Sequence, residues 1–204
     1  TNLDYDSLVA EVPNPLTGGE FAFYELLSPP ENLLTNPGEA YRDYDALMLR
    51  ANRRYADRWT FNASVVWTDM DGNTSDIDGY EPAWEDLNGL INNDGRPGNY
   101  SEWEGKVRAT VDLPWDMVLS GYYLYRSGEY WTPYVTVRGL LENNSTTVNL
   151  LERGSEQLPD YNRFDVHLDK RFNLSDKVAL TLVVDVFNVL DEDTALAVSQ
   201  RYGP

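Results

Sequence analysis

The run from Arg58 to Asp69, RWTFNASVVWTD, alternates between apolar and polar side chains. Its polar face is interrupted only by Val66, and its apolar face carries Trp59, Phe61, Ala63, Val65 and Trp67. The two tryptophans are eight residues apart in the sequence, which is roughly 26 Å in a strand that rises about 3.3 Å per residue. Outer-membrane β-barrels present an apolar band about 25 Å tall with aromatic girdles at both edges. The strand predicted here fits such a wall in length, in alternation and at both edges.

The same alternation recurs along the chain, cleanly in three later segments and less cleanly at Tyr44–Asn52 and Met117–Arg126. The sequence predicts about seven strands, at Phe21–Leu27, Tyr44–Asn52, Arg58–Asp69, Glu102–Leu113, Met117–Arg126, Arg163–Phe172 and Val178–Val189. The charged positions of their polar faces include Arg50, Lys106, Arg108, Arg163, Asp165, His167, Asp169 and Arg171. Such a face cannot be a dry core, because unpaired buried charge is too costly. It can line a water-filled lumen.

The segments that connect these strands alternate in length. Three are short, at Arg53–Asp57, Pro114–Asp116 and Asn173–Lys177, and two are long, at Met70–Ser101 and Ser127–Asn162. Outer-membrane barrels have short periplasmic turns and longer extracellular loops. We therefore expect an all-β fold: an antiparallel portion of a transmembrane β-barrel with short periplasmic turns and long extracellular loops.

Composition narrows the function classes. The 204-residue chain is 42% hydrophobic with a mean hydropathy of -0.51, which a barrel tolerates because only alternate residues meet lipid. The sequence has no run of about 18 apolar residues, which is the length that a transmembrane helix needs. The net charge of -18 argues against nucleic acid as a partner, since the phosphate backbone is bound by basic patches. The absence of cysteine excludes disulfides, zinc–thiolate sites and cysteine nucleophiles.

The order of motifs in the C-terminal half resembles a known family. Leu158–Leu174 reads LPDYNRFDVHLDKRFNL, and Val178–Thr194 reads VALTLVVDVFNVLDEDT. Tyr44–Arg54 and Ser64–Thr68 resemble the family's earlier strands, and Arg126–Tyr130 resembles its loop entry without the usual proline. The chain is similar to the C-terminal barrel region of TonB-dependent outer-membrane receptors, in particular those with an N-terminal carboxypeptidase-regulatory-like domain.

The resemblance implies a barrel of probably 22 strands filled by a plug domain. Residues 1–204 are then expected to be the C-terminal part of a single barrel domain, from which the plug, the earlier strands and the final strand are absent. The implied role is transport without catalysis, namely energy-coupled uptake of a nutrient across the bacterial outer membrane. The implied partners are the remainder of the barrel and the plug, the TonB energy-coupling complex reached through that plug, and outer-membrane lipid.

Two loop features suggest ligand sites. Oxygen-bearing side chains alternate around Gly72 and suit Ca²⁺, a hard cation, although an acidic turn is the commoner explanation of such a run. The calcium candidates are Asp69, Asp71, Asn73, Asp76 and Asp78. Aromatic side chains in the long loops either stack on a substrate or pack within the loops. The substrate-binding candidates are Tyr80, Trp84, Tyr130, Trp131 and Tyr134.

Two further expectations concern the polar face and the second loop. The only histidine, His167, lies between Asp165 and Asp169 on that face, and we interpret it as a lumen residue rather than as part of a catalytic triad. Tyr134–Val137 and Thr146–Leu150 alternate weakly and predict a hairpin that extends the barrel beyond the membrane. The alternative to a receptor is a soluble secreted β-sandwich that binds ligand and carries a calcium loop, which folds without detergent.

Overall fold

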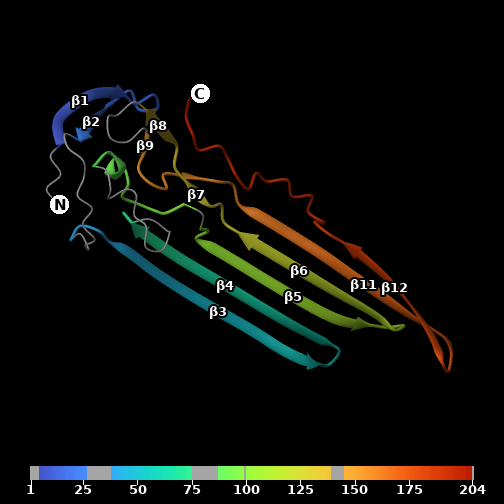
Figure 1. The fold of residues 1–204 in the computed structure, drawn as a ribbon. Helices are drawn as coiled ribbons and strands as arrows, with labels where there is room; N and C mark the ends of the chain where they lie inside the picture. The colour runs from blue at the N-terminus through green and yellow to red at the C-terminus, as the bar shows by residue number, and fades with distance from the viewer. Residues whose placement is uncertain (1–4, 27–37, 75–86, 99, 139–144, 204) are drawn as a thin grey trace.

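The computed structural model describes residues 5–26, 38–74, 87–98, 100–138 and 145–203. Long strands form one six-stranded antiparallel sheet, and short strands and loops form a cap at one end of it (Figure 1). The all-β prediction is confirmed. The sheet contains β3 (Arg42–Ala56), β4 (Trp59–Gly72), β5 (Trp103–Leu113), β6 (Met117–Arg126), β11 (Tyr161–Ser175) and β12 (Val178–Val186). The cap contains β1 (Tyr5–Pro13), β2 (Glu20–Leu26), a 3₁₀ turn η2 (Leu87–Leu90), β7 (Tyr130–Trp131), β8 (Tyr134–Arg138), β9 (Ser145–Asn149) and β10 (Glu156–Gln157).

The six strands follow the order β12-β11-β6-β5-β4-β3, and every neighbouring pair is antiparallel. Three of the pairs are hairpins closed by short turns. β3 and β4 continue to Ala56 and from Trp59, so the predicted turn at Arg53–Asp57 shrinks to Asp57 and Arg58, both with positive φ. Two successive residues with positive φ are the mark of a tight hairpin turn whose twist matches that of its strands. The tight turn lets the ladder run longer than the alternation in the sequence predicts.

The register gives the sheet two chemically distinct faces. Ala63 pairs with Val107, which pairs with Tyr123, which pairs with Phe164. Because side chains alternate across a strand, this row and every second row parallel to it form one face, here called the apolar face. The opposite face, called the polar face, carries the charged residues that the sequence assigned to a lumen.

The sheet is staggered from strand to strand. The Asp112 amide bonds the Arg58 carbonyl in the first turn, and the Arg171 amide bonds the Asp116 carbonyl in the second turn. Each successive hairpin therefore extends farther beyond its neighbour, as the lower right of Figure 1 shows. If the three short turns lie at one level, the strands are tilted, and tilt with stagger is what a sheet needs to close into a barrel.

No described segment of the chain covers the apolar face. Leu49 is 63% exposed, Val107 42% and Leu182 56%, and other large side chains on this face are similarly exposed. The buried apolar cluster lies in the cap instead, where Phe23 and Val148 are each 1% exposed. Long contiguous apolar surfaces on a protein mark contact with another protein or with a membrane. No helix among the described residues is long and apolar enough to cross a membrane.

Two predictions about the smaller elements have different outcomes. The hairpin of β8 and β9 is confirmed, with Tyr134 paired to Asn149 and Arg138 to Ser145. The strand predicted at Phe21–Leu27 exists as β2, but it pairs only with β1 and does not belong to the six-stranded sheet. The prediction of about seven strands in one wall was therefore wrong for β2, and the other six predicted strands form the sheet. The reason is that Phe21 and Phe23 bury their rings in the cap cluster rather than facing outward.

Asparagine side chains tie the cap together where strand ladders do not. The Asn88 amide group both accepts from the Tyr24 amide and donates to the Tyr24 carbonyl, each at 2.9 Å. The Asn14 amide donates to the Leu150 carbonyl at 2.6 Å. Asn14 and Asn88 are 5% and 1% exposed, and such buried amides stabilise a fold only when they are paired in this way.

Candidate functional site

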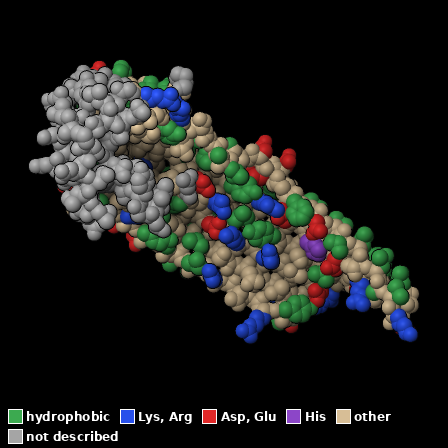
Figure 2. Space-filling model, in the orientation of Figure 1, with side chains coloured by type: hydrophobic (Ala, Val, Ile, Leu, Met, Phe, Trp, Pro, Cys, Tyr) green, Lys and Arg blue, Asp and Glu red, His purple; other side chains and the backbone are tan. Residues whose placement is uncertain are grey.

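The polar face of the sheet gathers residues that are far apart in the sequence. Figure 2 shows this face, with Lys and Arg side chains interspersed with Asp and Glu over its middle and further Lys and Arg side chains toward the short turns. One row crosses five strands in the order Arg50, Ser64, Lys106, Leu124 and Arg163. The sequence predicted that these charges share a face, but only the register shows that three strands bring their cations into one row.

Ion pairs neutralise part of this charge. The Lys106 ammonium lies 2.5 Å from the Glu104 carboxylate, and the Arg126 guanidinium lies 3.2 Å from the other oxygen of the same carboxylate. Arg163 pairs with Asp165 at 2.9 Å. These groups remain partly exposed to solvent, so their pairing fixes side-chain orientation more than it stabilises the fold.

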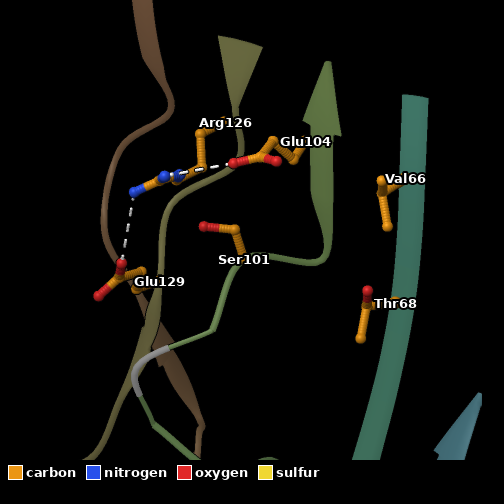
Figure 3. A pocket seen from close by; sticks show the side chains of 6 residues that line it. All are labelled: Val66, Thr68, Ser101, Glu104, Arg126 and Glu129. Atoms are coloured by element: carbon orange, nitrogen blue, oxygen red, sulfur yellow. Dashed lines mark hydrogen bonds and ion pairs between the residues drawn. The ribbon is translucent and has the colours of Figure 1, made fainter. Parts of the chain in front are cut away.

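A cleft of about 310 Å³ opens at the cap end of the polar face (Figure 3). Its lining residues are Val66, Thr68, Ser101, Glu104, Arg126 and Glu129. Arg126 points between Glu104 and Glu129, with the Glu129 carboxylate at 4.0 Å. The Ser101 hydroxyl is buried and makes no hydrogen bond to any residue that the structure describes. The cleft therefore offers two carboxylates, one guanidinium and two hydroxyls to a polar ligand.

Sequence reasoning did not select the cleft. Ser101 and Glu129 lie in the two long loops, and neither has a signal of spacing or residue type that connects it to Glu104. The chain brings them together because the start of β5 lies beside the end of β6. There the Trp103 amide donates to the Ser127 hydroxyl at 2.9 Å, and the Ser127 amide donates to the Trp103 carbonyl at 2.9 Å.

Tyr130, one of the predicted ligand contacts, is part of a buried network instead. It is 7% exposed, and its hydroxyl donates to the Glu102 carboxylate at 2.8 Å while accepting from Arg96 at 2.6 Å. Burial, followed by the bond to Glu102, raises the pKa of Tyr130 to about 12. The same hydrogen bond is the main cause of the lowered pKa of Glu102. Tyr130 thus joins the two long loops to each other and is closed to ligand.

The other aromatic candidates lie in different places. Trp131 and Pro133 line a mostly apolar groove of about 480 Å³ with Leu16, Leu151, Glu156 and residues 199–202. Tyr134 is held through its backbone, which bonds Gln200 and Tyr202. Tyr80 and Trp84 lie outside the described residues. Of the three candidates that the structure describes, Trp131 is the one that lines a groove wide enough for a ligand.

The structure describes three of the five calcium candidates, Asp69, Asp71 and Asn73. Asp76 and Asp78 lie outside the described residues. The Asn73 oxygen accepts from the Tyr41 amide at 3.0 Å, and its amide group donates to the Glu39 carbonyl at 2.9 Å. Asp69 lies 3.7 Å from the Arg96 guanidinium. Within the part of the chain that the structure describes, no group of three or more carboxylate or histidine side chains converges as metal ligands do, and the calcium site stays a prediction.

His167 lies between the carboxylates of Asp169 and Asp185. The sequence predicted Asp169 as a neighbour but not Asp185, which belongs to the adjacent strand β12. Nδ1 of His167 lies 2.6 Å from Asp185, and its Nε2 lies 3.6 Å from Asp169. Ser120 is its partner in register, yet the Ser120 hydroxyl bonds Thr110 at 2.9 Å. A nucleophilic triad needs a hydrogen bond between hydroxyl and imidazole, and the described residues do not provide one here.

Comparison of the chain with protein-family models, with curated proteins and with solved structures gives no match. What the chain does is therefore inferred from its two-faced sheet, its cleft and its cap.

Proposed function

We propose that the six-stranded sheet is part of the wall of an outer-membrane β-barrel, with its apolar face toward lipid and its polar face toward the lumen. The observation that carries the proposal is the uncovered apolar face of Leu49, Val107, Leu182 and their neighbours, which backs directly onto a charged face. Water would solvate the second face but not the first. Lipid on one side and a wet lumen on the other satisfy both.

Aromatic side chains support the same orientation. Trp67 and Trp103 are neighbours at the cap end of the apolar face, with ring centroids 6.5 Å apart. Trp59 is near the short-turn end, and Trp115 in the second turn is 79% exposed. Tryptophan is enriched at both membrane–water interfaces, where its ring is amphipathic. The apolar band therefore has an aromatic boundary at each end.

The two open edges of the sheet identify its first partner. β3 and β12 each have one neighbour among the described strands. In lipid, the unpaired amides and carbonyls of such edges cost several kcal/mol each. We infer that further strands of the same barrel pair with β3 and β12, and that the short turns face the periplasm and the cap faces outward.

The narrower proposal is that this barrel is a TonB-dependent receptor for energy-coupled nutrient uptake. It is supported by the resemblance of Leu158–Leu174 and Val178–Thr194 to that family, by the segregation of short turns from long loops, and by the polar cleft beneath the cap. A nutrient that binds between cap and lumen would meet the Glu104 and Glu129 carboxylates and Arg126. No step of bond making or breaking is required.

The alternative of a soluble calcium-binding β-sandwich has less support. A sandwich buries the apolar faces of two sheets against each other, whereas the described cap strands leave the apolar face of this sheet open. The side-chain oxygen of Asn73, one of the calcium candidates, also already accepts a hydrogen bond from the Tyr41 amide.

The proposal is tested by purifying the native protein from the outer-membrane fraction and measuring its intact mass. We expect it in that fraction, extracted only by detergent, with a mass several times the 23.3 kDa of this chain and with an electrophoretic mobility that changes on heating. A monomer of about 23 kDa that folds in buffer without detergent would overturn the barrel.

The uptake role is tested separately. Growth on the candidate nutrient should require both this protein and an intact energy-coupling complex in the inner membrane. Uptake that persists when the complex is disabled would reject the TonB-dependent role and leave the barrel standing.

A further inference from the structure

We propose that the cap binds a basic, partly apolar peptide in extended form across two adjacent grooves on its surface. The first, called the polar groove, has a volume of about 350 Å³, and Glu20, Asn92 and Glu152 are among its lining residues. The second, called the apolar groove, is the groove of about 480 Å³ that Trp131 lines. Leu151 lines both grooves, so one ligand can occupy the two together.

The inference names the class of ligand that the cap takes, which the proposed uptake role leaves open. It rests on the proposed barrel for one point, namely that the cap faces the medium from which the peptide comes. The two grooves are separate from the cleft at the end of the polar face, with which they share no lining residue.

The apolar groove offers the ligand a surface that water solvates poorly. Leu16 is 44% exposed and Tyr202 is 45% exposed, and both line this groove with Trp131. The C-terminal segment forms one wall, because the Tyr134 amide donates to the Gln200 carbonyl at 2.9 Å and the Tyr202 amide donates to the Tyr134 carbonyl at 2.8 Å. Apolar side chains of a ligand would remove this surface from water, which favours association.

The charged lining of the grooves is mostly acidic. Glu20, Glu152 and Glu156 are exposed, and their carboxylates form no ion pair with any residue that the structure describes. Among the described residues that line the two grooves, Arg201 is the only base. Complementary charge steers association and fixes the orientation of a partner. The free carboxylates therefore favour a ligand that carries positive charge beside its apolar groups.

Two side-chain amides favour a peptide over a neutral polysaccharide. The Asn92 amide group donates to the Asn149 carbonyl at 2.9 Å, but its side-chain oxygen has no hydrogen-bond partner among the described residues, and neither has the side-chain amide of Gln200. An extended peptide presents N–H and C=O groups that such amides can pair. Its lysine or arginine side chains carry the matching charge on an apolar stem, which a neutral polysaccharide lacks.

The experiment measures the binding of a short fluorescent peptide of Lys, Leu and Gly to the whole native protein in a neutral detergent. Fluorescence anisotropy gives the affinity, with empty micelles as the blank, and we expect saturable binding. Peptides with Ser in place of Leu, or with Glu in place of Lys, should bind at least about tenfold more weakly, because each lacks one of the two complementary features. A neutral glucose oligosaccharide should not displace the peptide. Equal binding of the three peptides, or displacement by the oligosaccharide, would overturn the proposal.

A variant without the acidic groups locates the site. Glu20→Gln/Glu152→Gln/Glu156→Gln keeps the shape of the lining and removes its negative charge, so it should weaken binding of the basic peptide about tenfold. The comparison of peptides on the native protein needs no variant, and it remains decisive if this one does not assemble.

The matched control makes the same change of net charge far from the cap. It replaces one exposed aspartate in each of the three short turns: Asp57→Asn/Asp116→Asn/Asp176→Asn. This variant should bind the peptide as the wild type does. Equal weakening in the two triple variants would mean that net charge alone attracts the peptide, and it would overturn the site in the grooves.

The two proposals fail in distinguishable ways. Saturable binding to the extracted protein, with no difference between intact cells that carry the wild type and those that carry the triple Gln variant, means that the cap does not face the medium. That result contradicts the orientation of the barrel and leaves the ligand class standing. Extracted protein that keeps its heat-dependent mobility but does not bind the peptide leaves the barrel standing and overturns the peptide site.

Discussion

Individual residues in the cap act mainly by closing the two long loops onto each other. Where these loops cross, Gly95 lies against the Arg153 carbonyl and Gly154 against the Arg96 carbonyl. The same crossing is joined by the bond from the Arg96 amide to the Arg153 carbonyl. The sequence shows these glycines but gives no sign that they meet, because a long-range backbone approach leaves no periodic pattern.

Replacing Gly95 by alanine should open this crossing. Gly95 has a φ of +130°, and a Cβ there would lie 2.3 Å from the Arg153 carbonyl oxygen. We expect Gly95→Ala to destabilise the cap by about 1–3 kcal/mol from backbone strain alone, measured as faster limited proteolysis of the loops. Gly38→Ala, at a glycine with open space around it and no positive φ, is the control. Equal proteolysis of the two variants would contradict the described crossing.

Tyr130 should make the cap sensitive to alkali. Its pKa in the folded protein is about 12, above the ordinary value of 10. The unfolded chain therefore ionises first, so the stabilisation is fully present below pH 10 and is lost as the pH rises toward 12. In proteolysis of the loops between pH 9 and pH 12, wild type should weaken over this window. Tyr130→Phe should weaken less steeply but not become flat, because burial also raises the pKa of Tyr100, whose ring contacts Tyr130.

The control for that titration is Tyr202→Phe, which removes a tyrosine that is 45% exposed. It should behave as wild type does. A Tyr130→Phe variant with the wild-type alkaline profile would show that another group opens the loops.

At the scale of elements, the alternation of side chains predicts the long strands, because successive side chains of a strand point to opposite faces of the sheet and here the two faces differ in polarity. It does not predict the ends of the strands, since β3 continues through residues of mixed polarity from Arg53 to Ala56, where its register with β4 shifts. It also fails for β2, whose two phenylalanines have the spacing of a wall strand but pack on Val148 and Leu150. Residues of the cleft, such as Ser101 and Glu129, come from loops in which no period exists to be read.

The first hairpin turn carries strain that a glycine would relieve. Arg58 has a φ of 74°, a left-handed conformation that costs an L-residue roughly 1–2 kcal/mol. Arg58→Gly creates the Asp-Gly pair that tight hairpins favour, and we expect the free energy of unfolding to rise by about 0.5–1 kcal/mol. Denaturation of the detergent-refolded protein measures this change.

Lys177→Gly is the matched control, because Lys177 is in another short turn and does not have a positive φ. There, glycine should only add freedom to the unfolded chain and lower the stability slightly. A destabilised Arg58→Gly variant would mean that the turn is not of this type.

Neighbouring residues of β4 should respond in opposite ways to the same substitution. Ala63 is on the apolar face and Asn62 on the polar face. An arginine facing lipid costs about 2–4 kcal/mol near the bilayer midplane, so Ala63→Arg should lower the stability of the vesicle-folded protein by about that amount. Asn62→Arg should cost less than about 1 kcal/mol, because water solvates the new charge and only its repulsion from Arg108, the register partner of Asn62, opposes it. Similar losses in both variants would remove the distinction between lipid and lumen.

At the scale of the whole molecule, the large apolar side chains of the sheet are exposed, and the buried ones lie in the cap. Among the residues that the structure describes, the sheet has no buried core, and the buried cluster of Phe21, Phe23, Val148 and Leu150 lies in the cap. The alternating sequence predicted this arrangement as far as the wall is concerned, since a face of charges excludes a dry interior. It could not predict the cap cluster, which depends on contacts between segments more than a hundred residues apart.

The stagger of the hairpins gives a prediction about depth in the membrane. Ala63 and Phe164 share a register row through Val107 and Tyr123, yet Ala63 is much closer to its own short turn than Phe164 is. If the short turns lie at one level, a spin label at position 164 should lie nearer the outer surface than one at position 63. The difference should be roughly 15 Å for strands that rise about 3.3 Å per residue with a tilt near ~45°.

Collision of single spin labels with oxygen and with a water-soluble nickel complex measures this depth, and residues 1–204 contain no cysteine that would compete with the introduced one. Labels at positions 107 and 123, which lie on strands that share one turn, should report nearly equal depths and serve as the internal control. Equal depths at positions 63 and 164 would mean that the sheet is not tilted, and a sheet without tilt cannot close into the barrel that its two faces require.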